Sequence, residues 1–98
     1  MDRREFIIQE IVVNGRVIKT VVVDGHLEKH SDITDDLLLD LVRLLEGVEQ
    51  LPDDVSPPYE YFVNILEMNG KQYRLVWLLE DNKLYIGVLT AYRDDRRK

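Results

Sequence analysis

The chain of 98 residues contains no cysteine, which excludes disulfide bonds, thiol nucleophiles and cysteine-based zinc sites. It has no apolar run near the roughly 20 residues that a membrane-spanning helix needs. Basic residues are also in the minority, with 13 Lys and Arg against 19 Asp and Glu, and the formal charge is −6. Because proteins that coat nucleic acids carry a basic face, this balance argues against nucleic-acid binding by charge alone.

What is present is the composition of a soluble globular protein. Hydrophobic residues make up 45% of the chain and charged residues 33%, and 98 residues have room for one core. We therefore expect a single domain over residues 1–98. The arginines near Met1 are not followed by an apolar core or a cleavage site, so we also expect a cytoplasmic protein with no membrane partner.

Asn-Gly pairs mark two tight hairpin turns, at Asn14-Gly15 and at Asn69-Gly70. Both central residues of a type I′ turn need a positive φ, which Asn-Gly tolerates best. A third turn is expected near Asp81-Asn82. The stretches between these turns have the β-branched and aromatic composition of strands. The expected strands are 6–13, 16–24, 59–68, 71–79 and 83–93.

Residues 33–47 change to a helical period. Thr34 can cap the helix, Asp35 and Asp36 suit the positive end of its dipole, and Gly47 is a suitable stop. One side of this helix is polar and the opposite side is apolar and wide enough to lie across a sheet. The sequence therefore predicts an α+β fold, an antiparallel sheet built from a β-hairpin and a three-strand meander with one helix packed on a face.

Two-residue turns fix the register of the meander, and therefore which side chains share a face. This register aligns Trp77 with Phe62 and Ile86 on one face. It places Arg74 between Ile65 and Leu89 on the other. Gly87, in the middle of its row, is predicted to be a close approach for the helix backbone.

Both histidines, His26 and His30, lie in the connection between the second strand and the helix, where functional loops are common. A helical segment would bring both imidazoles to one side as in a metal pair, whereas a single histidine could act as a general acid or base near neutral pH. They could also be plain polar residues of a connection. Because the spacing fixes no third ligand, we predict neither a metal nor a cofactor.

Arg74 is unusual because it is a cation on a strand between apolar neighbours. An arginine held in this way makes a rigid clamp for phosphate or carboxylate, and Arg93 and the adjacent Tyr92 at the end of the last strand could join it. The alternative is a structural salt bridge from Arg74 to Glu67 or to an acidic residue of the helix.

With these residues identified, the stretch from His26 to Arg93, about two thirds of the chain, resembles the small RelE-like toxins of the barnase–EndoU–colicin–RelE group. Three motifs carry the resemblance: His-x-x-Lys-His-x-x-Ile-Thr from His26, the strand Tyr-Arg-Leu-Val-Trp from Tyr73, and the final strand from Tyr85 to Arg93. Active members of the group cleave RNA without a metal. The resemblance implies that His26 or His30 is the acid or base, Arg74 and Arg93 are the phosphate clamp, and Tyr92 stacks or donates a proton.

Such toxins are usually strongly basic, whereas this chain is acidic and begins with a hairpin. Residues 28–54 hold nine acidic and two basic residues, so the negative charge belongs to the helix and its flanking loops. An inactive relative is therefore one alternative. Another is a non-catalytic interaction module, immunity-like, antitoxin-like or homodimeric. Its hairpin would supply a dimerisation edge, and its acidic helix face would meet a basic protein partner.

Overall fold

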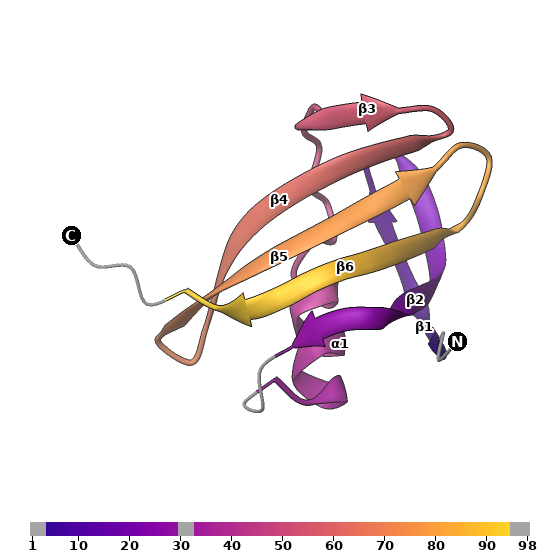
Figure 1. Ribbon diagram of the computed structural model, residues 1–98. Coiled ribbons are helices and arrows are strands. Elements are labelled where there is room, and N and C mark those ends of the chain that lie inside the picture. Colours follow the sequence, from indigo (N-terminus) through magenta and orange to yellow (C-terminus); the bar gives the residue numbers. More distant parts are fainter. Residues whose placement is uncertain (1–3, 30–32, 95–98) are drawn as a thin grey trace.

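A computed structural model describes residues 4–29 and 33–94, which form one helix and six strands (Figure 1). The strands belong to one curled sheet in the order β1-β2-β6-β5-β4-β3. The elements in chain order are β1 (Arg4–Val13), β2 (Arg16–Lys29), α1 (Asp35–Arg43), β3 (Asp54–Ser56), β4 (Tyr59–Met68), β5 (Lys71–Glu80) and β6 (Tyr85–Arg93). The fold is therefore α+β, with both the hairpin and the meander in place.

The two hairpins predicted at the Asn-Gly pairs are present in the structure. Asn14 and Gly15 have φ of 52° and 72°, and Asn69 and Gly70 have φ of 56° and 78°. These positive angles close the β1–β2 and β4–β5 hairpins in the two-residue form expected of Asn-Gly. The register between β4 and β5 is confirmed throughout the pair, from Tyr59 opposite Glu80 to Met68 opposite Lys71.

The prediction of an antiparallel sheet is wrong, because β2 pairs with β6 in parallel. Val21 is the register partner of Ile86, and Val23 is the partner of Val88. These two strands are separated by the helix and three other strands, so no turn residue signals their pairing. The parallel pair joins the hairpin to the meander and makes the sheet mixed.

The predicted register between β5 and β6 is also wrong. Four residues, 81–84, separate these strands instead of two, and the register shifts again between Val76 and Trp77. As a result Trp77 lies opposite Val88 instead of Ile86, and Arg74 lies opposite Tyr92 instead of Leu89. A β-bulge leaves little trace in a single sequence, because one extra residue changes no turn signal.

The helix begins as predicted and ends earlier. The Thr34 Oγ1 accepts a hydrogen bond from the backbone N–H of Leu37 at 3.1 Å, which is an N-cap. The helix ends at Arg43, and a tighter turn continues to Gly47, whose φ is 83°. After it the short edge strand β3, which the proline-rich sequence did not predict, pairs antiparallel with β4.

The core lies between α1 and one face of the sheet. Phe62 and Trp77 stack with ring centroids 4.2 Å apart and an interplanar angle of 13°. Figure 1 shows the helix behind β6 and the end of β2, on this face. The helix contributes Leu38, Leu41 and Val42 to the same buried cluster, and Leu45 follows in the next turn.

Polar groups link the core to the hairpin turn. The Trp77 Nε1 donates to the Asn64 Oδ1 at 2.8 Å, and the Asn64 Nδ2 donates to the Gln50 Oε1 at 3.0 Å. The Gln50 backbone N–H donates to the Asn14 Oδ1 at 2.8 Å. Burying the indole therefore leaves its N–H satisfied, and the chain of bonds fixes the segment after the helix against the β1–β2 turn.

Gly87 does not meet the helix backbone as predicted, and this expectation is wrong. It is the register partner of Leu78, which points away from the helix-covered face. A Cβ on Gly87 would lie 2.9 Å from the Leu78 Cδ1, so the Leu78 side chain covers the space that the missing side chain leaves.

Candidate functional site

The side of β4, β5 and β6 that faces away from the helix carries the residue that the sequence analysis singled out, Arg74. Residues that are register partners share a face, so Arg74 has Ile65 on one side and Tyr92 on the other. Two further pairs continue the face, Val63 with Val76 and Tyr61 with Leu78. We call these seven residues the open face, because Figure 1 shows no other described helix or strand in front of β4, β5 and β6.

Arg74 is held in place by a buried carboxylate. The Arg74 Nη2 lies 3.4 Å from the Asp94 Oδ2, and the Asp94 side chain is only 9% exposed. The Asp94 backbone N–H donates to the carbonyl of Gln72 at 2.9 Å, which fixes Asp94 beside β5. The salt-bridge alternative for Arg74 is therefore the one observed, although its partner is Asp94 rather than Glu67 or the helix.

One nitrogen of Arg74 is left over. Its Nε is buried and has no hydrogen-bond partner among the described residues. The ion pair with Asp94 nevertheless offsets the charge of the guanidinium, and the Arg74 side chain is only 23% exposed. An anion at this position would have to compete with a fixed carboxylate, which weakens the case for a phosphate clamp.

Tyr92 and Arg93 do not act on the same side of the sheet. Tyr92 is the partner of Arg74, whereas Arg93 is the partner of Tyr73, a residue of the helix-covered face. Because successive strand residues point to opposite faces, Arg93 and Arg74 lie on opposite sides. The clamp predicted from these two arginines is not assembled.

The two histidines are only partly placed. His26 lies in β2 between the residues that pair with Val88 and with Thr90 of β6, and the structure describes its backbone alone. The segment is therefore a strand, and the helical arrangement that would align two imidazoles does not form up to Lys29. His30 lies outside the described residues. Among the side chains that the structure describes, those of residues 4–23 and 33–94, no three metal-ligating groups come together.

The open face is the feature that sequence reasoning missed. Ile65 is 45% exposed, and the other six side chains are half-buried, with no second layer over them in the described part of the chain. The sequence of β4 and β5 does contain a signal for this open face. Apolar residues occupy both faces of each strand, whereas only one helix is present to cover them.

Acidic residues border the open face. Asp54 of β3 is the register partner of Tyr61, and Glu67 and Glu80 follow at opposite ends of β4 and β5 on the same side. The surface of α1 and the segment after it adds more exposed negative charge. Its exposed acidic residues are Asp36, Asp40, Glu46, Glu49 and Asp53.

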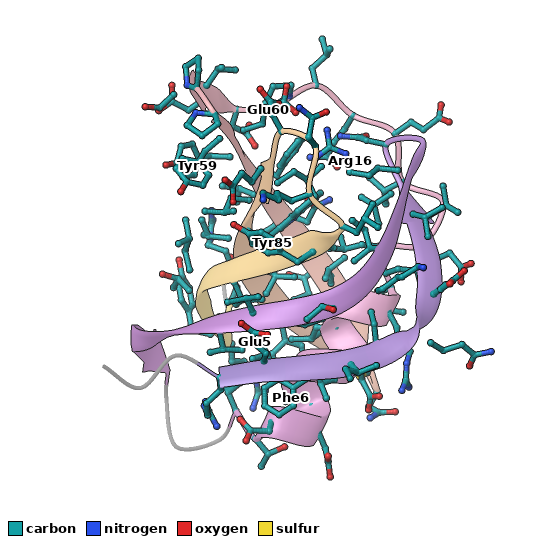
Figure 2. The ribbon with its side chains drawn as sticks, turned by 90° about the vertical axis from the view of Figure 1, so that its right-hand side faces the viewer. Glu5, Phe6, Arg16, Tyr59, Glu60 and Tyr85 are labelled. Atoms are coloured by element: carbon teal, nitrogen blue, oxygen red, sulfur yellow. The ribbon has the colours of Figure 1, made fainter. Side chains whose placement is uncertain are left out.

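A shallow hollow lies where β1 and β2 approach the start of β6. Figure 2 looks toward it across the β1–β2 hairpin, with Glu5 on β1 and Tyr85 on β6. The lining residues are Glu5, Lys19, Thr20, Val22, Lys83, Leu84 and Tyr85. The Tyr85 hydroxyl donates to the Glu80 carboxylate at 2.5 Å. The hollow mixes charges of both signs and contains none of the predicted catalytic residues.

Comparisons with protein-family models, curated proteins and solved structures find no match to this chain. The resemblance to RelE-like toxins therefore stays a prediction that rests on short motifs. In the described part of the chain, no helix combines the length and the apolar character needed to cross a bilayer.

Proposed function

We propose that this chain is a non-catalytic protein-interaction module that binds a basic protein through its open face. The observation that carries the proposal is the apolar centre of that face, where Val63 pairs with Val76 and Tyr61 with Leu78, and no described segment covers them. An antiparallel sheet with one solvated face normally carries polar residues there. An uncovered apolar patch on a small domain is typical of a protein-binding surface.

The charge of the partner follows from the border of the patch. Asp54, Glu67 and Glu80 surround the apolar centre, and the positive charge of Arg74 is offset by Asp94. The whole chain carries a formal charge of −6. An apolar centre with a charged rim is the usual anatomy of a specific interface, and complementary charge speeds encounter and selects the partner. A basic protein with an apolar contact surface fits this arrangement.

A pair of matched variants tests the proposal. Val76→Lys places a charge in the centre of the open face, and Val12→Lys makes the same change on the exposed surface of β1, where Val12 is 44% exposed. Proteins are captured from an extract of the source cells with the wild-type chain and with both variants. A protein retained by the wild type and by Val12→Lys, but not by Val76→Lys, is then purified and titrated.

The expected partner is basic, and Val76→Lys weakens its binding on the order of a hundredfold, as charge insertion at an interface centre does. The wild-type affinity should also fall as salt is raised. Equal binding to both variants, or a captured partner that is acidic, would contradict the proposal.

Metal-independent RNA cleavage is the second candidate function. What favours it is the pairing of Arg74 with Tyr92 on one face, with the strand that contains His26 running beside β6. The test is incubation of a short single-stranded RNA at low salt with a chelator present, using wild type, Arg74→Ala and His26→Ala. Cleavage that both substitutions reduce would support this function, and absence of binding and cleavage would remove it.

A further inference from the structure

In the described part of the chain, three residues other than glycine have a positive φ, and all three are asparagines that connect antiparallel strands. Asn14, Asn69 and Asn82 have φ of 52°, 56° and 63°. Asparagine tolerates this conformation better than most residues. It is also thermolabile, because the backbone nitrogen of the next residue can attack its side-chain carbonyl. The surroundings of the three asparagines differ, so their susceptibility to this attack should differ as well.

The attack converts asparagine into an acid in two steps. The backbone nitrogen of the next residue loses its proton to base and bonds to the asparagine Cγ, and the side-chain amide leaves as ammonia, so a succinimide ring forms. Water then opens the ring at either of its carbonyls, which gives aspartate or isoaspartate. A side chain on the next residue hinders the approach of its nitrogen, whereas glycine has no Cβ and does not. An unrestrained asparagine followed by glycine is therefore the reactive combination.

Asn14 is followed by glycine, but its turn is fastened to the segment after the helix. Its Oδ1 accepts a hydrogen bond from the Gln50 backbone N–H at 2.8 Å, and its own N–H donates to the Val48 carbonyl at 2.7 Å. Beside the turn, the Gly47 N–H donates to the Val12 carbonyl at 2.7 Å. While these three bonds hold, the Asn14 side chain cannot turn toward the nitrogen of the next residue.

Asn82 has the opposite combination. It is exposed, in the connection between β5 and β6, but the residue after it is Lys83. The Lys83 side chain hinders the approach of the Lys83 nitrogen to the Asn82 Cγ. That nitrogen is also engaged, because the Lys83 N–H donates to the Glu80 carbonyl at 3.1 Å. Exposure alone therefore does not make Asn82 reactive.

Asn69 combines the features that favour the attack. Glycine follows it, both residues are exposed, and no hydrogen bond holds the Asn69 side chain within the described residues. A Cβ on Gly70 would meet nothing within 4 Å, so the space around the attacking residue is open. The ladder between β4 and β5 ends beside the turn, at the Met68–Lys71 pair. Figure 1 shows this turn at one end of the meander, far from the β1–β2 hairpin.

We propose that Asn69 is a site of spontaneous deamidation, whereas Asn14 and Asn82 are protected by their surroundings. The Gly70 nitrogen attacks the Asn69 Cγ, ammonia leaves, and water completes the conversion. A closed turn does not align these two atoms, so the turn has to open locally before they react. The end of a ladder opens readily, whereas opening at Asn14 breaks hydrogen bonds to another segment.

The products would change the turn beside the open face. Either product adds a negative charge two residues from Glu67, which belongs to the acidic border of that face. Isoaspartate also adds one carbon to the main chain of a turn that fixes the register between β4 and β5, including the Ile65–Arg74 pair. The reaction itself needs no partner at the open face, so it is independent of the proposed function.

Peptide mapping by mass spectrometry tests the proposal on the ageing protein. The full chain is incubated at mildly alkaline pH, which speeds loss of the backbone proton, beside a parallel sample in urea. In the native sample, the mass increase of amide-to-acid conversion should appear at Asn69 on the order of a hundred times faster than at Asn14, because hydrogen bonds hold Asn14. In urea the two Asn-Gly pairs lose these surroundings and should react at similar rates.

Asn69→Gly is the matched control, because glycine keeps the positive φ of the turn and removes the reactive amide. Anion-exchange chromatography should show an acidic species that accumulates in the wild type and is absent from this variant. Native conversion of Asn14 or Asn82 as fast as that of Asn69 would overturn the proposal. So would a native Asn69 that stays intact while the urea sample reacts, or the same acidic species from Asn69→Gly.

Discussion

The two faces of β4 and β5 are both apolar, yet they differ in how deeply their side chains are buried. On one face Phe62, Leu75 and Trp77 are completely buried beneath the helix. On the other face Val63, Val76 and Leu78 are only half-buried, and no second layer lies over them in the described residues. A fold of this size needs one apolar face for its core. The second face adds little to that core, and we propose that its composition serves binding.

The largest expected contrast comes from the same substitution on the two faces. Leu75→Ala removes a fully buried side chain and should lower the free energy of unfolding by about 2–5 kcal/mol. Leu78→Ala on the open face should lower it by about 1 kcal/mol. Urea denaturation followed by tryptophan fluorescence measures both values. Equal losses would mean that the open face belongs to the core.

Asn64→Ala tests the side-chain hydrogen bonds on the face that the helix covers. It removes the acceptor of the Trp77 Nε1 and the donor to the Gln50 Oε1. Because the indole N–H would then be buried without a partner, the free energy of unfolding should fall by about 1–3 kcal/mol. The control is Gln72→Ala, which truncates an exposed amide side chain of β5. A loss at Asn64 no larger than the loss at Gln72 would show that the bond is replaced by water.

Gly87→Ala measures how tightly the open face is packed. The new methyl group would lie 2.9 Å from the Leu78 Cδ1, so one side chain must move, at a cost of about 1 kcal/mol. In the Leu78→Ala background this cost should disappear. A double-mutant cycle by thermal unfolding gives the coupling. Additive effects of the two substitutions would mean that Leu78 does not cover Gly87 in solution.

The smallest effect is expected on the solvent side of the helix. Arg43 lies 3.4 Å from Asp40 one turn earlier, and both side chains are at least half exposed. An exposed pair of this kind adds little, so Arg43→Ala should change the free energy of unfolding by about 0.5 kcal/mol or less. Chemical denaturation measures this change. A much larger loss of unfolding free energy would show that the acidic side chains of this surface repel one another and that Arg43 offsets the repulsion.

The sequence predicts the features that depend on residues close together in the chain. The Asn-Gly turns give the two hairpins, Thr34 gives the start of the helix, and the register of β4 and β5 places Arg74 beside Ile65. The parallel pairing of β2 with β6 depends on contacts between segments far apart in the chain, and no turn residue indicates it. The relative placement of the candidate residues was also beyond short-range signals, because the register shift between β5 and β6 puts Tyr92 beside Arg74 and Arg93 on the other face.

The most direct test of the division between the two faces is a paired measurement on Val76→Lys. Its free energy of unfolding and its affinity for the captured basic partner are measured on one preparation, beside wild type and Val12→Lys. The expected result is an unfolding free energy within about 1 kcal/mol of wild type, because a lysine can extend its charge into solvent from a half-buried position. Affinity should fall on the order of a hundredfold. An unfolded Val76→Lys chain, or one that keeps full affinity, would contradict the account.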